Sequence, residues 1–277
     1  MQAVLNAVIN FSRHPVARRM PLTTAMRILR WQVICRRRDV VNIPWINGTR
    51  LIARHGMTGL TGNIYYGLHE FHEMAAMLHI LRPDDVFADV GANAGSYTVL
   101  AAGVAGARVD AFEPGLASAN ALDRNIFINK LRDRVRVHRK AVGARSGTAQ
   151  FIDDAGTMNR LSPAGKSKVP VTTLDHALAN PTIIKMDIEG GELDALKGAE
   201  KTLRSPSLRL IITESHGKEV CELMGVAGFN KYRYNAFLRR LTPLATEDGN
   251  ALFLRDPAAA EKLMQEAQSV SVFGLNI

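Results

Sequence analysis

The sequence contains little cysteine: its 277 residues include two, and neither stands in a Cys-x-x-Cys pattern. Cys35 and Cys221 therefore predict neither a disulfide framework nor a zinc site, and they are typical of a reducing, cytoplasmic setting. No apolar run approaches the ~20 residues that a membrane-spanning helix needs. Asn6, Asn10, Arg13 and His14 interrupt the apolar N-terminus, and no basic region precedes it, so a secretory signal is not expected.

Acidic residues are nearly absent from the first 54 positions, which hold ten arginines and only one acid, Asp39. This segment accounts for the whole formal net charge of +9, because the other 25 basic and 25 acidic residues balance. We therefore expect a basic helical extension over residues 1–54 and a neutral domain over residues 55–277.

Within the extension, apolar residues recur at helical spacing and predict a helix over residues 22–35. They are Leu22, Met26, Leu29 and Val33, with Arg27 and Arg30 to one side. Three roles fit this pattern: a helix packed on the domain with a solvated basic face, a membrane-surface contact through residues 1–40, or a nucleic-acid contact. The first is favoured and the third disfavoured. The second would place the protein at the inner face of the membrane. Trp31 and Trp45 are expected in the core.

Residues 39–66 alternate in polarity and contain four glycines, which predicts short strands and turns. From residue 85 onward, apolar runs alternate with helical patterns, which predicts an α/β fold with a mostly parallel sheet and helices on both faces. Seven strands are expected, at 86–90, 108–112, 135–142, 182–186 and 208–213, with closing antiparallel strands at 229–235 and 251–255. Residues 193–203 predict one helix, and residues 153–170 an insertion.

Ligands of such sheets bind beyond the carboxyl ends of the strands, where the strand order reverses. After the strand at 86–90 comes a glycine-rich run, Asp-Val-Gly-Ala-Asn-Ala-Gly at 89–95. A dinucleotide-binding loop would need glycine at position 93, where this chain has Asn93, so a nicotinamide oxidoreductase is disfavoured. An amino-acid-bearing nucleoside such as S-adenosylmethionine fits better, with its carboxylate at the helix start. Glu113 ends the second strand and suits a ribose diol.

Taken together, these motifs resemble those of the FkbM-type methyltransferases over roughly residues 65–255. The matching runs, in the family's order, are Asp89–Thr98, Ala111–Pro114, Val171–Asp175, Ile184–Gly190, Gly191–Glu192, Leu196–Ala199 and Ile212–His216. The resemblance implies a class I, Rossmann-like methyltransferase fold with a seven-stranded sheet, S-adenosylmethionine as cofactor, and O-methylation of a hydroxyl, often on sugars or secondary metabolites.

The resemblance also implies the residues that bind the cofactor. The methionine part would be lined by Asp89, Gly91, Asn93 and Gly95, the ribose held at Glu113, and the adenine placed near Ala141. Glu70, Pro114 and Asp187 would also face the cofactor. The chain lacks an acidic residue after its third strand, where many class I enzymes bind the adenine amine. Backbone groups would then take over that contact.

A hydroxyl acceptor needs a general base or a metal ion. We expect Asp187, Glu189, Glu214 and His216 to converge at the carboxyl edge of the sheet. His216 is the first candidate base because its ordinary pKa lies near neutrality, and a capping role is equally open. Asp187 and Glu214 can hold Mg²⁺, pair with Lys185 or bind the cofactor amine, and a metal is not favoured. Glu189 fits either catalysis or the structure of its turn.

The chain contains no Pro-Pro pair, so it lacks the Asn/Asp-Pro-Pro-aromatic run of amine methylases, and N-methylation is disfavoured. The sequence thus predicts an S-adenosylmethionine-dependent O-methyltransferase acting on a small molecule, a sugar or a lipid-linked glycan. The alternatives are an RNA methyltransferase and a catalytically silent cofactor-binding module. Acceptor contacts are expected from variable loops at 55–70, 153–170 and 231–250, for which one sequence gives no code.

Overall fold

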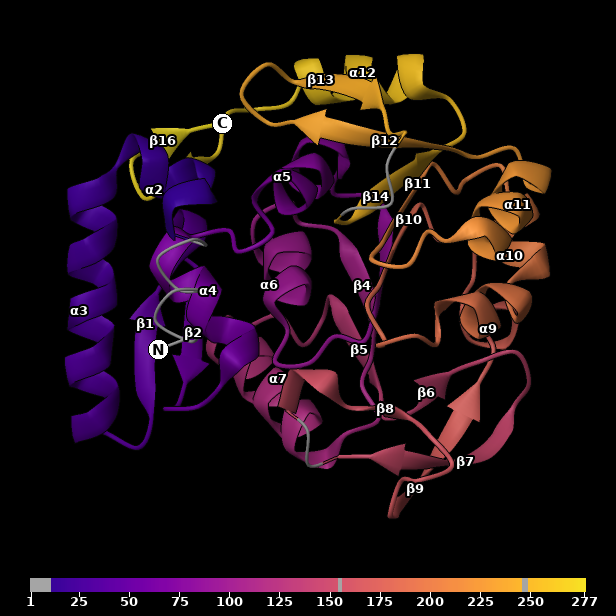
Figure 1. Cartoon of the computed structure of the whole chain (residues 1–277), viewed down its shortest axis with the longest axis horizontal. Helices are drawn as coiled ribbons and strands as arrows, with labels where there is room; N and C mark the ends of the chain where they lie inside the picture. The colour runs from indigo at the N-terminus through magenta and orange to yellow at the C-terminus, as the bar shows by residue number, and fades with distance from the viewer. Residues whose placement is uncertain (1–10, 154–155, 246–248) are drawn as a thin grey trace.

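The computed structural model describes residues 11–153, 156–245 and 249–277 (Figure 1). Predictions that concern residues 1–10, including Asn6 and Asn10, lie outside the described residues, as do parts of the expected loops at 153–170 and 231–250. The helices are α2 (Pro15–Arg19), α3 (Pro21–Arg37), α4 (Thr58–Tyr66), α5 (Phe71–Ile80), α6 (Ser96–Gly103), α7 (Leu116–Ile128), α8 (Leu174–Ala177), α9 (Glu192–Lys197), α10 (Glu200–Arg204), α11 (Lys218–Val226) and α12 (Pro257–Gln265).

A central sheet has the strand order β13-β12-β14-β11-β10-β3-β4-β5. Its strands are β3 (Val86–Val90), β4 (Arg108–Phe112), β5 (Val135–His138), β10 (Ile183–Met186), β11 (Leu210–Thr213), β12 (Asn230–Asn235), β13 (Arg240–Pro243) and β14 (Ala251–Leu254). Strands β5, β4, β3, β10 and β11 are parallel, and β14 runs antiparallel between β11 and β12. The predicted mostly parallel Rossmann-like sheet is confirmed, with two differences. Its antiparallel strand β14 is not at the edge, and a hairpin adds β13 as an eighth strand.

The chain forms β3, β4 and β5 toward one edge and then returns to form β10 on the other side of β3. The strand order therefore reverses between β3 and β10, which is the switch point where such sheets bind ligands. All four residues of β10 are buried, and so are all four of β11. This agrees with their continuous apolar runs, which predicted strands covered on both faces.

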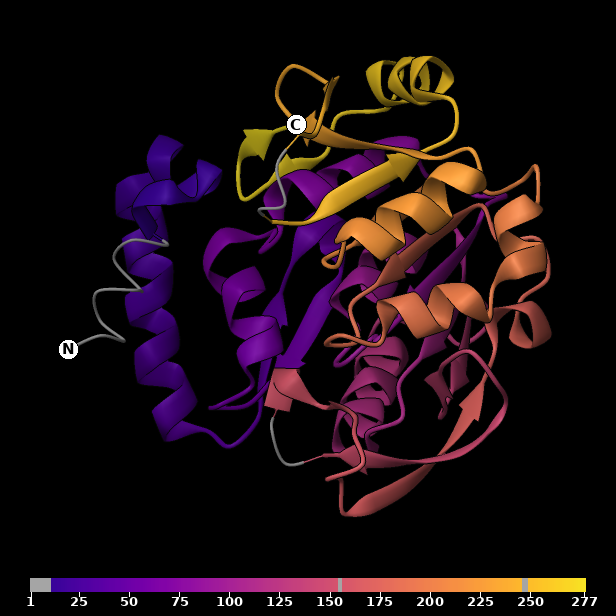
Figure 2. The same ribbon diagram turned by 45° about the vertical axis from the view of Figure 1, so that its right-hand side comes forward.

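Alternate residues of the strands feed two hydrophobic cores, because successive side chains point to opposite faces of a sheet. Phe87 and Ile183 pack with helices α5, α6 and α7, whereas Ala88 and Ile184 pack with α9, α10 and α11. Figures 1 and 2 show these two helical layers on either side of the sheet. The carboxyl ends of the strands are left for the connecting loops.

A second, four-stranded sheet has the order β6-β9-β7-β8 and consists of β6 (Ala141–Val142), β7 (Gly147–Ile152), β8 (Arg160–Leu161) and β9 (Ser167–Thr172). The single strand predicted over 135–142 is wrong, because β5 ends at His138 and Ala141 pairs instead with Val171 of β9. The expected insertion at 153–170 is therefore part of a sheet rather than a free loop.

Two helical predictions need correction. Residues 39–66 form the expected strands β1 (Val41–Pro44) and β2 (Arg50–Ala53), but the last nine residues form α4. A Cβ on Gly62 would lie 2.1 Å from Nδ1 of His69, so that glycine serves close packing rather than a turn. The helix predicted at 193–203 is divided into α9 and α10 at Gly198, where a Cβ would lie 2.3 Å from the carbonyl oxygen of Gly143.

The predicted basic helix at 22–35 is confirmed as α3, which packs against α4. Trp31 and Cys35 are buried, and Arg27 donates from Nε to the carbonyl of Tyr65 at 2.9 Å. Trp45 is buried as well, so both tryptophans are core residues as expected. The apolar row that predicted the helix faces solvent instead. None of the helices in the described part of the chain combines the length and apolar character needed to cross a bilayer.

Candidate active site

A cavity of about 880 Å³ opens at the carboxyl ends of β3, β4, β10 and β11, at the switch point of the sheet. Its volume falls within the range of small-molecule sites. Most of the residues predicted for the site line it, namely Glu70, Gly91, Asn93, Glu113, Pro114, Ala141, Asp187, Glu189 and Glu214. Asp89, Gly95 and His216 are not among the described residues that line this cavity.

Gly91 lies where the loop after β3 meets the loop after β10. Its φ is +80°, and a Cβ there would lie 2.0 Å from the carbonyl oxygen of Asp187. A side chain at position 91 is therefore excluded by both backbone conformation and space. The contact brings the glycine-rich loop against the loop that carries Asp187, so the two form one wall of the cavity.

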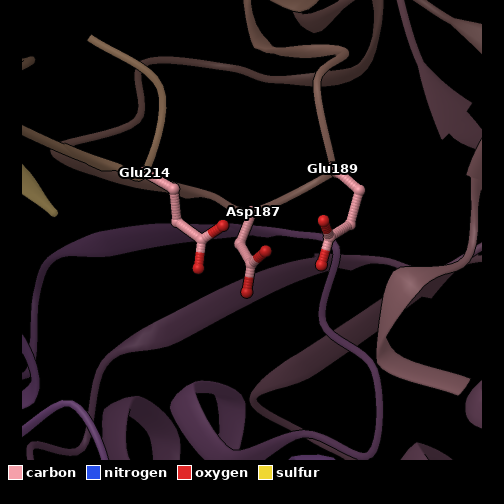
Figure 3. A group of neighbouring side chains, drawn as sticks. All are labelled: Asp187, Glu189 and Glu214. Carbon is pink, nitrogen blue, oxygen red and sulfur yellow. The ribbon is translucent and has the colours of Figure 1, made fainter. Parts of the chain in front are cut away.

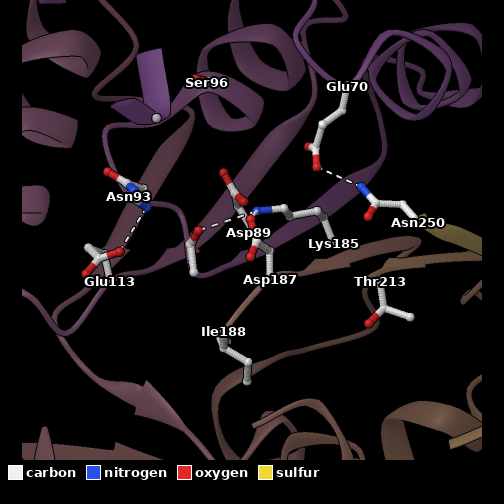
Figure 4. Close-up of polar contacts among 12 residues, drawn as sticks. Glu70, Asp89, Asn93, Ser96, Glu113, Lys185, Asp187, Ile188, Thr213 and Asn250 are labelled. Atoms are coloured by element: carbon white, nitrogen blue, oxygen red, sulfur yellow. Dashed lines mark hydrogen bonds and ion pairs between the residues drawn. The ribbon is translucent and has the colours of Figure 1, made fainter. Parts of the chain in front are cut away.

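Glu113 is held rigidly at the end of β4 (Figure 4). Its Oε2 accepts a hydrogen bond from the backbone N–H of Asn93 at 2.9 Å, and its Oε1 accepts one from Gly115 at 2.8 Å. Burial raises the pKa of Glu113, and these two N–H groups partly offset the rise. Each carboxylate oxygen keeps a second lone pair, so both can still accept a hydrogen bond from a diol.

Asp89 and Gly95 shape the glycine-rich loop from inside the protein. Asp89 is fully buried, and its Oδ2 accepts a hydrogen bond from Oγ1 of Thr98 at 2.6 Å, which ties the end of β3 to α6. Its Oδ1 has no hydrogen-bond partner among the described residues, and burial raises its pKa. A Cβ on Gly95 would lie 2.5 Å from Cδ1 of Leu122. Asp89 and Gly95 were predicted to line the cofactor site, but both lie beneath the cavity surface and support the loop from behind.

Lys185 is the charged centre of the site. Its Nζ lies 3.1 Å from Oδ2 of Asp187 (Figure 4). The same Nζ lies 5.0 Å from the ring centroid of Tyr97. Burial acts to lower the pKa of Lys185, but Asp187, Asp89 and Glu70 outweigh it and raise the pKa above its ordinary value. The amine is therefore protonated and neutralises part of the surrounding acid. A lysine within an otherwise apolar strand is the sequence signal for this role, which goes beyond the predicted pairing with Asp187 or Glu214.

Asp187, Glu189 and Glu214 converge, with carboxylate oxygens within 4.8 Å of one another. Figure 3 shows the three carboxylates projecting to the same side, from the loops after β10 and β11. Partial burial, followed by the charges of Asp187, Glu70 and Glu189, raises the pKa of Glu214 to about 7. Burial, followed by Asp187 and Glu192, also raises the pKa of Glu189. Glu214 can therefore exchange a proton near neutral pH.

His216 does not join this group, so the predicted convergence of four side chains is corrected to three. Its ring is buried, and Nε2 lies 2.6 Å from the carbonyl oxygen of Gly249, while Nδ1 has no partner among the described residues. The chain turns directly after β11, where the N–H of Ser215 donates to Oγ1 of Thr213 at 3.3 Å. That turn directs Glu214 to the cavity and His216 into the protein.

Glu70 immediately precedes the first residue of α5, and its side chain lines the cavity. Its Oε1 accepts a hydrogen bond from Nδ2 of Asn250 at 2.7 Å (Figure 4). The bond connects the helix before β3 with the loop before β14. Asn250 is not predictable from the sequence, because two residues 180 positions apart give no local signal.

A sheet of this strand order, with a glycine-rich loop and strand-end carboxylates at its switch point, defines the Rossmann-like fold of class I methyltransferases. Residues 89–240 match the family model described as the methyltransferase FkbM domain. The chain therefore belongs to the FkbM methyltransferase family.

Similar proteins include the hexuronic acid methyltransferase AglP of Haloferax volcanii, with 28% identity over 163 residues, which is 54% of this chain and 66% of that protein. Among solved structures, the FkbM methyltransferase of Methylobacillus flagellatus is 18% identical, with a TM-score of 0.47 over 83% of this chain and 59% of that one. An rRNA methylase from Streptococcus thermophilus is 15% identical, with a TM-score of 0.40 over 67% of this chain and 94% of that one.

Proposed function

We propose that this protein is an S-adenosylmethionine-dependent O-methyltransferase that acts on a hydroxyl of a sugar, a glycan or another small molecule. Family membership supplies the methyl transfer and implies the cofactor. The observation that carries the proposal of O-methylation is Glu214, a carboxyl with a pKa of about 7 in the same cavity as the glycine-rich loop. A carboxyl tuned to neutrality can take a proton from a hydroxyl.

The residues present fit the cofactor. The glycine-rich loop borders the cavity through Gly91 and Asn93, and Glu113 offers a lone pair on each oxygen to a ribose diol. Pro114 and Ala141 border the same cavity, where they would contact the adenine. When bound, S-adenosylmethionine supplies a methyl group that its positively charged sulfur activates for displacement.

In the proposed reaction, Glu214 would accept the proton of the acceptor hydroxyl while the oxygen takes the methyl group. The methyl–sulfur bond would break in the same step, so that S-adenosylhomocysteine leaves. Partial burial, together with the charges of Asp187, Glu70 and Glu189, keeps the pKa of Glu214 high enough for its carboxylate to act as a base near neutral pH. Lys185 stays protonated and compensates the charge of Asp187. Positioning of the oxygen against the methyl group supplies the rest of the rate.

A sugar acceptor is supported by the relative AglP, which is named a hexuronic acid methyltransferase. An RNA acceptor is disfavoured because the chain after residue 54 is neutral and the amine-binding Pro-Pro motif is absent. A lipid-linked glycan remains within the proposed class of acceptor.

The test combines binding with turnover. Calorimetry is expected to show binding of S-adenosylmethionine and S-adenosylhomocysteine but not of NAD. With methylated sugars as the readout, Glu214→Gln should lower kcat by about 100-fold or more while the cofactor Kd stays unchanged. The matched variant Glu219→Gln, on exposed helix α11, should keep full activity. A protein that binds the cofactor but transfers no methyl group to any hydroxyl would instead be a silent module.

The pH profile gives a second measurement. Because the base must be deprotonated, kcat/KM should rise as the pH increases through about 7, the pKa of Glu214. Removing the neighbouring charge in Glu189→Gln should move that inflection to lower pH. An inflection that stays in place would show that Glu214 is not the titrating group.

We propose that the reaction needs no metal ion. Asp187, Glu189 and Glu214 have the oxygen ligands that Mg²⁺ prefers. However, Nζ of Lys185 lies 3.1 Å from Oδ2 of Asp187, so this oxygen already has a cationic partner. Turnover is therefore expected to be unchanged after treatment with a chelator. A loss of activity that added Mg²⁺ restores would assign the three carboxylates to a metal.

A further inference from the structure

Helix α3 carries apolar side chains on two opposite faces, whereas a surface helix ordinarily has them on its inner face alone. Its inner face, with Trp31 and Cys35, is buried against the protein. The outer face carries an apolar row, which we call the outer stripe: Leu22, Met26, Leu29 and Val33, exposed by 82%, 66%, 60% and 42%. Large contiguous apolar surface on a soluble protein marks an interaction site. In Figure 1, α3 forms one outer side of the molecule.

Arginines flank the outer stripe on both sides. At 3.6 residues per turn, Arg30 and Arg37 lie along one side of it and Arg36 along the other. All three are exposed. The only acidic residue in the first 54 positions is Asp39, which follows α3, so this face has almost no negative charge of its own.

The flanking arginines favour one kind of binding partner for the outer stripe over the two others that could be considered. A second copy of the chain would bring arginine against arginine with no carboxylate to pair them. A nucleic acid would take the arginines but leave four apolar side chains in water. An anionic lipid surface satisfies both features, because apolar side chains enter the headgroup boundary while arginines meet the phosphates.

We propose that α3 docks this protein peripherally on anionic lipid membranes, lying flat through the outer stripe and its flanking arginines. The 17 residues of α3 give a contact of about 25 Å. Such a contact fixes how the cavity is presented, because α3 packs on α4, and Gly59 and Asn63 of α4 line the cavity. Docking would hold the active site close to the bilayer surface.

The experiment is flotation of the full-length protein with vesicles of phosphatidylcholine plus phosphatidylglycerol, and with vesicles of phosphatidylcholine alone. The protein should float with the anionic vesicles, and salt should release it. Replacing the outer stripe by Leu22→Ser, Met26→Ser, Leu29→Ser and Val33→Ser should lower the partition at least about tenfold. These side chains are solvent-exposed, so the variant should fold.

Charge is tested separately with Arg30→Glu and Arg37→Glu, for which we expect a loss of more than about fivefold per arginine on anionic vesicles. Arg30→Lys and Arg37→Lys should keep most of the binding. The matched control is Lys166→Glu with Lys168→Glu, two exposed lysines elsewhere that make the same change in net charge. That control should float as the unchanged protein does.

Four results would overturn the proposal. The first is failure to float with anionic vesicles, and the second is flotation that survives loss of the outer stripe. The third is a dimer in sedimentation that the outer-stripe substitutions dissociate, which would make this face a contact between copies. Salt-sensitive RNA binding that needs the arginines but not the outer stripe would also contradict it.

Discussion

Gly91 shows how one residue can set the geometry of two loops. Gly91→Ala places a methyl group 2.0 Å from the carbonyl oxygen of Asp187 in a backbone conformation with φ of +80°. We expect a loss of about 2 kcal/mol in the free energy of unfolding and cofactor affinity weakened at least about tenfold. Denaturant unfolding and calorimetry measure the two effects.

The control for this variant is Gly225→Ala, at a helical glycine of α11 with open space around it. It should be neutral or stabilise by up to about 1 kcal/mol, because alanine is the better helix former. Equal effects at the two positions would contradict the close approach at Gly91.

The second prediction at the residue scale concerns the stability that Lys185 contributes. Lys185→Met leaves the carboxylate of Asp187 without its partner at 3.1 Å and Asp89 without a nearby cation. Removing one member of a buried pair costs about 3 kcal/mol or more. The double variant Lys185→Met with Asp187→Asn should recover part of that loss in denaturant unfolding. A double variant no more stable than the single one would show that the charges do not interact.

The residues of the site could be predicted as far as topology determines them. Glu113, Asp187 and Glu214 follow strands whose carboxyl ends meet at one edge, so their proximity is a property of the sheet. His216 lies only two residues beyond Glu214, but the turn at Thr213 directs the His216 side chain away from the cavity. The apolar periodicity of the sequence contains no signal for this turn. The role of Asp89 depends on burial beneath the loop surface, which its motif position does not reveal.

At the scale of elements, α3 offers a matched comparison between its two faces. Trp31→Ala should cost about 3 kcal/mol or more in the free energy of unfolding, because it removes a large side chain that is 5% exposed. Leu29→Ala on the outer face, 60% exposed, should change it by less than about 0.5 kcal/mol. Denaturant unfolding of both variants tests this. Similar losses would mean that the outer face is buried in solution.

Regular apolar patterns predicted most elements, and the exceptions have identifiable causes. The strands β3 and β4 match their predicted bounds because they are short apolar runs between turn residues. Helix α4 was missed because its glycines resemble turn signals, whereas Gly62 makes room for His69. The division of β5 from β6 depends on which strand pairs with Ala141, and that partner is 30 residues away.

At the scale of the whole molecule, the boundary between residues 54 and 55 stays a prediction. Val16, Trp31 and Leu51 belong to the same hydrophobic core as Phe87 of the central sheet. The backbone N–H of Arg50 also donates to Oδ1 of Asn129 in the domain, at 2.7 Å. The charge pattern that suggested the division describes the surface of the segment rather than its packing.

Two histidines affect how the free energy of unfolding depends on pH: His79, which is buried, and His14, which is partly buried. Burial lowers the pKa of His14 and of His79 to about 4, so the unfolded chain takes up their protons first. The stability that the two neutral histidines contribute is fully present above pH 6.5. As the pH falls from 6.5 toward 4, the free energy of unfolding decreases by about 1.4 kcal/mol per pH unit for each histidine. Glu73 and Glu214, whose pKa values are raised to about 7, act with the opposite sign.

The measurement is the free energy of unfolding against pH for the unchanged protein and for His79→Gln. The variant should have a slope smaller by about 1.4 kcal/mol per pH unit between the two pKa values. His176→Gln, at an exposed position, should leave the slope unchanged. An unaltered slope in His79→Gln would show that His79 titrates normally in the folded protein.

Helix α4 has a neighbour on each side: Tyr65 accepts hydrogen bonds from Arg27 and Gln32 of α3, while Asn63 borders the cavity and donates to Oγ of Ser96 at 3.0 Å. Protein interiors compress little, so a rigid helix transmits a displacement rather than absorbing it. A push on the outermost helix would therefore reach the start of α6, where the glycine-rich loop ends. The outermost helix and the wall of the cavity are thus joined through α4, by the hydrogen bonds of Tyr65 on one side and of Asn63 on the other.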